Sequence, residues 1–147
     1  MRILYHHRTQ GEEPESIHIE SIVQALIGLG HEVRVIGPSG ASNRGNGRNG
    51  SALVGRIKRA MPGPVFELMQ LGYNLVVFWR LWRAVRQFRP DLIYERYALY
   101  NFAGVWLAKR RKIPLILEVN TPYARAWDQY FGLILRSLAR WIERRTL

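Results

Sequence analysis

The sequence contains no cysteine, which excludes a disulfide scaffold, a cysteine-ligated zinc site and a thiol nucleophile. It is also poor in acidic residues, with 11 aspartates and glutamates against 22 lysines and arginines. The resulting net charge of +11 favours phosphate-bearing partners, namely nucleic acid, anionic lipid headgroups or phosphorylated small molecules. The sign of the charge does not choose among these three.

No apolar run is long enough to span a bilayer. The most hydrophobic stretch, 65–82, contains Glu67, Gln70, Asn74 and Arg80, whereas a membrane-spanning helix needs about 20 nearly uncharged residues. The N-terminal residues are interrupted too early by polar side chains to form the apolar region of a signal peptide. We therefore expect a cytoplasmic protein.

Short β-branched or aromatic segments alternate with longer segments of helical periodicity. Because 48% of the residues are apolar, the chain can bury a substantial core. The alternation predicts an α/β fold in one domain over residues 1–147, a doubly wound, Rossmann-like parallel sheet with the first strand central. The expected strands lie near residues 2–6, 32–36, 91–95 and 115–119, and the expected helices near 16–29, 64–88, 99–111 and from 127 to the C-terminus.

Two of these helices have a predicted apolar face. In the long helix over 64–88, we expect a buried stripe at Leu68, Leu71, Leu75, Phe78, Trp82 and Val85. In the last helix, we expect an apolar face at Trp127, Tyr130, Phe131, Ile134, Leu138, Trp141 and Ile142, opposite a cationic stripe at Arg136, Arg140 and Arg144.

The segment 39–63 differs from the rest. It is rich in glycine and contains five basic residues and no acidic one, which predicts a basic loop. Together with Trp79, Arg80, Trp82 and Arg83 of the long helix, this loop could meet the headgroups of an anionic membrane. The alternative is that these cations form a solvated surface.

Polar residues gather where the predicted strands end. In an open parallel sheet, ligands bind at the carboxyl ends of the strands, where the strand order reverses. Some of these residues have a structural alternative, since Glu95 and Glu118 could form ion pairs with Arg96 or another arginine, and His18 could be a surface or capping residue. The candidate substrate-binding residues are Gly11, His18, Glu95, Arg96, Glu118 and Asn120.

Five blocks of the sequence, in order, resemble a known family. They are the opening Arg2–Tyr5, the helix that carries His18, the turn Leu29-Gly30-His31-Glu32-Val33, and the two strand segments 90–97 and 113–120. This arrangement resembles the N-terminal, acceptor-binding domain of family-4-type GT-B glycosyltransferases.

The resemblance implies a hexosyltransferase-type enzyme in which the cleft between two domains transfers the sugar, commonly without a metal. The C-terminal domain, which would hold the nucleotide-diphosphate sugar, is absent from these 147 residues, so the resemblance predicts that this chain alone is inactive. Gly11 and its neighbours would face the donor, and His18 would line the acceptor side. No metal and no cofactor are expected, because the nucleotide-sugar is a substrate.

The sequence departs from this family at two positions. Many members carry a histidine where this chain has Asn120, and an asparagine can orient a hydroxyl but cannot exchange a proton. The loop that contains Gly11 has one glycine where members often have two.

Three function classes remain to be compared. The leading interpretation is sugar transfer to a lipid-linked or polysaccharide acceptor at the inner face of the membrane, with an anionic membrane surface as a further partner. The alternative is a non-catalytic basic module that binds nucleic acid or an anionic membrane. No nucleic-acid motif is found, so nucleic acid is not an expected partner. A nucleotide-binding Rossmann protein is disfavoured because no glycine fingerprint follows the first strand.

Overall fold

The computed structural model describes residues 1–8, 13–38, 63–120 and 133–147. Gly11 lies outside these residues, and so does the predicted basic loop except for Gly63. The part of the last predicted helix before residue 133 also lies outside them. The elements are β1 (Arg2–His6), α1 (Glu13–Gly28), β2 (Glu32–Ile36), α3 (Gly63–Phe88), β3 (Leu92–Arg96), α4 (Ala103–Arg111), β4 (Leu115–Glu118) and α6 (Arg136–Thr146).

The four strands form one parallel sheet in the order β2-β1-β3-β4. The predicted α/β class, the four strands and the interior position of the first strand are thereby confirmed. In the register, His6 lies beside Glu95, and Arg96 lies beside Glu118. Because side chains alternate along a strand, Glu95 and Arg96 project from opposite faces of the sheet.

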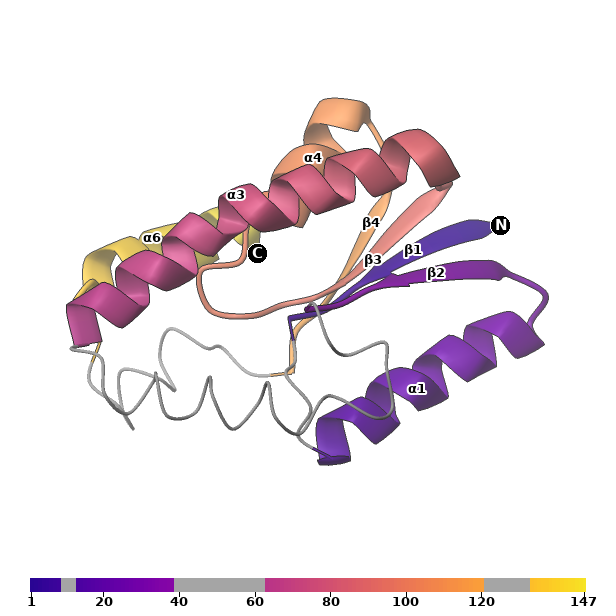
Figure 1. Cartoon of the computed structure of the whole chain (residues 1–147), viewed down its shortest axis with the longest axis horizontal. Helices are drawn as coiled ribbons and strands as arrows, with labels where there is room; N and C mark the ends of the chain where they lie inside the picture. Colours follow the sequence, from indigo (N-terminus) through magenta and orange to yellow (C-terminus); the bar gives the residue numbers. More distant parts are fainter. Residues whose placement is uncertain (9–12, 39–62, 121–132) are drawn as a thin grey trace.

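Helices cover both faces of the sheet, as a doubly wound fold requires (Figure 1). α1 lies against one face, and α3 with α4 lies against the other. The main core fills the space between the sheet and these two helices, and Leu4, Leu81, Ile93 and Leu107 are almost fully buried there. This packing fixes the carboxyl ends of β1 and β3, where the candidate site lies.

Gly30 ends α1 as the sequence predicts. Its φ of 81° lies in the left-handed region that glycine adopts without strain. The N–H of Gly30 donates to Ile27 O (2.9 Å) and the N–H of His31 donates to Leu26 O (3.1 Å). These two bonds are the Schellman pattern, which turns the chain from α1 into β2.

The buried face of α3 differs from the predicted stripe. Leu68 and Leu75 are exposed, at 66% and 77%, and of the predicted stripe only Val85 is buried. The helix is turned so that other positions face inward, and two of them carry polar side chains. The buried residues are Glu67, Asn74, Val77, Leu81, Ala84, Val85 and Phe88.

Glu67 and Asn74 determine this rotation because each holds a neighbouring segment. Glu67 accepts bonds from Tyr100 Oη (2.6 Å) and from the N–H groups of Ile134 (2.8 Å) and Leu135 (2.9 Å). The amide of Asn74 donates to Tyr100 O (2.7 Å) and accepts from the N–H of Phe102 (3.2 Å). α3 thus holds both the turn before α4 and the residues that lead into α6.

α4 and α6 also depart in detail from the sequence prediction. α4 begins at Ala103, because Tyr100 adopts a φ of 59° that ends the preceding turn. α6 begins only at Arg136, and of the predicted apolar face Ile142 is buried, whereas Ile134, Leu138 and Trp141 are exposed. Ala139 and Thr146 take the other inward positions. This narrow face packs in a second core cluster with Tyr100 and Leu133, while Arg136, Arg140 and Arg144 are exposed as predicted.

Candidate functional site

The candidate site lies where the chain order reverses in the sheet. From β1 the chain passes to β2 on one side and later returns to β3 on the other side. In an open parallel sheet, ligands bind in the crevice at such a reversal, at the carboxyl ends of the strands. Two polar clusters occur at this edge, one on each face of the sheet.

The first cluster is centred on the carboxylate of Glu118, the last residue of β4. Its Oε1 lies 2.9 Å from Asn120 Nδ2, 3.3 Å from His18 Nε2 and 3.7 Å from Arg96 Nη1. Its Oε2 accepts a bond from Tyr5 Oη at 3.4 Å. We call this group, with Tyr94, the Glu118 cluster; its members are Tyr5, His18, Tyr94, Arg96, Glu118 and Asn120.

Within this cluster, two buried side chains lie beneath two exposed ones. The side chains of Arg96 and Glu118 are only 9% and 10% exposed, whereas that of His18 is 52% exposed. Asn120 is also exposed. The carboxylate therefore fixes one nitrogen of His18 and of Asn120, and the remaining polar atoms of both can meet a ligand. An imidazole and an amide are suited to positioning a sugar hydroxyl.

Two tyrosines form the floor of the cluster. The rings of Tyr5 and Tyr94 stack with centroids 5.0 Å apart. Burial and the charge of Glu118 raise the pKa of both hydroxyls above the ordinary value of 10. These tyrosines thus remain neutral hydrogen-bond donors to Glu118 and help to keep its carboxylate in place.

Burial also affects Tyr97 and Tyr100, which yields a test by titration. Burial and the neighbouring Glu143 carboxylate raise the pKa of the Tyr97 hydroxyl. For Tyr100, burial and its bond to Glu67 raise the pKa in the same way. Tyr5, Tyr97 and Tyr100 have the largest of these shifts and should therefore remain protonated at pH 11 in the native protein.

Absorbance at 295 nm, recorded at pH 11 with and without denaturant, measures this difference. Denatured protein should gain about three more phenolates than native protein, and stability should fall as pH rises above 10, because only the unfolded chain then releases these protons. Equal amplitudes in the two samples, with the native fold intact by circular dichroism, would contradict the burial of these hydroxyls.

The second cluster is centred on Glu95, on the face that packs against α3 and α4. Glu95 is fully buried, and its Oε1 lies 2.7 Å from His6 Nδ1 and 3.1 Å from Asn101 Nδ2. Its carboxylate packs directly on Gly104, in the first turn of α4. The structure thus pairs Glu95 with His6 and not with the adjacent Arg96, which lies on the other face.

Arg8 lies close to this second cluster. Its guanidinium bonds to Gln70 Oε1 at 2.5 Å and lies over the ring of Tyr73, 4.9 Å from the centroid. Burial lowers the pKa of Arg8, and the neighbouring Tyr73 and Glu95 partly oppose this shift. The charge of Arg8 therefore complements the buried Glu95 carboxylate from the side of α3.

The two adjacent histidines point in different directions, as their alternation predicts. His6 bonds to Glu95, whereas the ring of His7 packs against Gly37, at the end of β2. Both are buried.

The structure therefore brings His18, Arg96, Glu118 and Asn120 together and places Glu95 on the opposite face. Gly11 lies outside the described residues. A substrate-binding role for the six residues stays a prediction. Tyr5 and Tyr94 are partners that the sequence analysis missed, and the signal for them was their position on the same face of neighbouring strands as Arg96 and Glu118.

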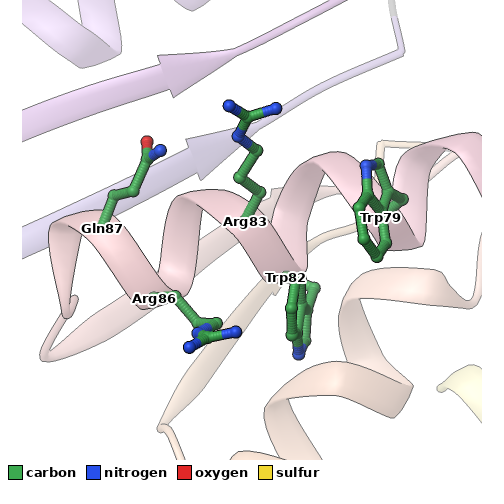
Figure 2. A pocket seen from close by; sticks show the side chains of 5 residues that line it. All are labelled: Trp79, Trp82, Arg83, Arg86 and Gln87. Atoms are coloured by element: carbon green, nitrogen blue, oxygen red, sulfur yellow. The ribbon is translucent and has the colours of Figure 1, made fainter.

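A shallow hollow elsewhere on the surface shares no residue with either cluster. It lies on the C-terminal half of α3 and is lined by Trp79, Trp82, Arg83, Arg86 and Gln87 (Figure 2). Within the described ranges, no three histidine, aspartate or glutamate side chains are close enough to hold a metal ion.

The comparison with protein families agrees with this geometry. The glycosyl transferase 4-like domain matches residues 16–147, which covers all the described elements except β1 and the first three residues of α1. Neither the curated proteins nor the solved structures gave a match. With a parallel α/β sheet, polar residues at its carboxyl edge and a family match over most of its length, the chain belongs to the glycosyl transferase 4-like domain family.

Proposed function

We propose that this chain is the acceptor-side domain of a GT-B glycosyltransferase. It would serve the transfer of a sugar from a nucleotide-diphosphate sugar to a lipid-linked or polysaccharide acceptor. The observation that carries the proposal is the Glu118 cluster, in which a buried carboxylate presents His18 and Asn120 at the carboxyl edge of the sheet. The family membership supports sugar transfer as the reaction.

The chemistry of the cluster fits binding and orientation of an acceptor hydroxyl. Asn120 cannot exchange a proton, so in this proposal it orients the hydroxyl. His18 is the exposed titratable group beside it and would receive the hydroxyl proton, while Arg96 offsets the charge of Glu118 below. The proposal includes a cytoplasmic location and attachment to the inner face of an anionic membrane, where a lipid-linked acceptor would be found.

The test compares two histidines at opposite edges of the sheet. His18 lies at the carboxyl edge, and His31 precedes β2 at the amino edge. Binding of UDP-glucose, GDP-mannose and a panel of methyl glycosides is measured by isothermal titration with the H18A and H31A variants. We expect H18A to weaken binding of at least one of these probes by up to about tenfold, the effect of losing one hydrogen bond between neutral groups.

In the same assay, H31A should bind like the wild type. An equal effect of both substitutions, or the lack of binding of any probe to the wild type, would contradict the proposal. A radiolabelled transfer assay on the 147-residue chain tests the further prediction that the chain alone does not turn over a nucleotide-sugar.

A further inference from the structure

The outward face of α3 is apolar from Val65 to Trp79 and has no packing partner among the described residues. Val65, Leu68, Leu75 and Trp79 recur at helical spacing, and their exposed fractions are between 50% and 77%. Gly72 lies on the same face, and a side-chain carbon added there would meet open space. This face is opposite the residues that α3 buries against the sheet and α4, so the packing of the described elements leaves it uncovered.

The second half of the same face is cationic. Arg83 and Arg86 follow Trp79 at helical spacing and are exposed. The rings of Trp79 and Trp82 stack, with centroids 5.0 Å apart, and the Arg86 guanidinium lies over the Trp82 ring at 4.8 Å. Figure 2 shows Arg83 and Gln87 leaving α3 on one side of the hollow, and Trp82 with Arg86 on the other.

No acidic side chain of α3 interrupts this surface. The only acidic residue in α3 is Glu67, which is 5% exposed and is held by Tyr100 and by the backbone at Ile134 and Leu135. The face therefore carries positive charge alone. A second copy of the chain, also with a net charge of +11, would meet it with like charge.

This combination fits the boundary between headgroups and acyl chains. An interfacial helix places leucine and valine in the acyl region, tryptophan at the boundary and arginine among the anionic headgroups. Within the described segments, no helix is long and apolar enough to cross a membrane, so α3 would lie along the surface.

We propose that the outward face of α3, from Val65 to Arg86, is the surface by which this domain binds an anionic phospholipid bilayer. The apolar half inserts shallowly, and the hollow at Trp79, Arg83 and Arg86 receives headgroup phosphates. The proposal rests on the membrane attachment included in the proposed function, and it identifies the surface of this domain that would make that contact. It does not depend on sugar transfer.

The consequence is a defined orientation of the sheet. The N-terminal half of α3 extends past the carboxyl ends of the strands, beside α6 (Figure 1). A bilayer against this face would therefore lie on the α3 side of the sheet, whereas the Glu118 cluster lies on the face that α1 covers.

The test is flotation of the full chain with vesicles of phosphatidylglycerol and phosphatidylcholine, and with vesicles of phosphatidylcholine alone, at rising salt. Two variants change the face: L68S/L75S/W79S removes apolar contacts, and R83Q/R86Q removes two charges. Their matched controls are I17S/I27S/L29S, in or just after α1 on the other side of the sheet, and R144Q/R145Q in α6; all the replaced apolar residues are exposed.

We expect the wild type to bind the anionic vesicles and to dissociate at high salt. The apolar triple variant should lose at least about tenfold in partition coefficient, because three side chains no longer enter the membrane. The R83Q/R86Q variant should lose about thirtyfold, at about 1 kcal/mol for each of the two cations near the surface. Brominated lipids should quench tryptophan fluorescence in the wild type and less in a W79F variant.

Equal losses in the face variants and their controls would overturn the assignment to α3, as would vesicle binding that the apolar triple variant leaves unchanged. Binding of a homopolymer RNA that competes with vesicles and depends only on the arginines would favour a nucleic-acid surface instead. The flotation test contains no sugar donor, so its failure would leave the sugar-transfer proposal unaffected. In the same way, failure of the H18A binding test would leave the membrane-surface proposal unaffected.

Discussion

Replacing Glu67 by alanine should lower the free energy of unfolding by about 3–5 kcal/mol, the largest effect that we expect from a single side chain. Glu67 is buried and accepts one bond from Tyr100 Oη and two from the N–H groups of Ile134 and Leu135. The substitution leaves all three donors without this acceptor, and Tyr100 Oη is buried. Hydrogen exchange in α6 should accelerate with the loss of stability, because these residues lead directly into that helix.

Two controls separate this role from a general charge effect. Glu32 forms an exposed ion pair with Arg2 (3.3 Å), so E32A should change stability by less than about 1 kcal/mol. E67Q keeps the volume but exchanges one acceptor oxygen for a donor, and it should lose about half as much as E67A. Urea unfolding of the three variants measures the differences, and similar midpoints for E67A and E32A would contradict the assigned role.

The same carboxylate gives a pH dependence. Burial alone would raise the pKa of Glu67, but the bonds from Tyr100, Ile134 and Leu135 hold it below its ordinary value of 4.5. Because the pKa is lowered in the folded state, the stabilisation is present above pH 4.5 and is lost as the pH falls towards the lowered value. In E67Q this contribution is absent, so its stability should decline less steeply in that acid range.

Replacing Gly104 by alanine should destabilise the protein by about 3 kcal/mol. The new methyl group would overlap the carboxylate of Glu95, which is fully buried and bonded to His6 and Asn101. Either α4 moves away from the sheet or Glu95 leaves its partners, and both changes disturb the packed core.

Gly72 provides a matched control, since it is also a helical glycine but has open space around it. G72A should stabilise the protein by about 0.5–1 kcal/mol, because alanine restricts the unfolded chain and favours helix. Thermal unfolding of both variants gives the comparison. If both changes stabilise the fold, Glu95 does not occupy the position against Gly104.

Much of the architecture follows from the sequence alone. The strand and helix segments could be predicted because their hydrophobic periods differ and because Gly30 marks the turn into β2. The alternation of side chains also explains the two clusters, since Glu95 and Arg96 are adjacent and must face opposite sides. The register between β1 and β3 then brings His6 to Glu95, and that between β3 and β4 brings Arg96 to Glu118.

The orientation of α3 could not be predicted in the same way. Hydrophobic spacing favoured burial of Leu68 and Leu75, but the interior positions went to Glu67 and Asn74. Each of these polar side chains is satisfied by groups from segments far along the chain, which local periodicity does not report. For the same reason, the exposed apolar face of α3 became visible only in the structure.

The central claim, that sugar-transfer substrates bind at the carboxyl edge of the sheet, is tested most directly by two-dimensional amide NMR. The ¹⁵N-labelled chain is titrated with UDP-glucose, GDP-mannose and the methyl glycosides. The account predicts shifts that saturate and are largest at His18, Arg96, Glu118 and Asn120, and that H18A reduces. Shifts confined to the hollow at Trp79 and Trp82, or none with any probe, would contradict it.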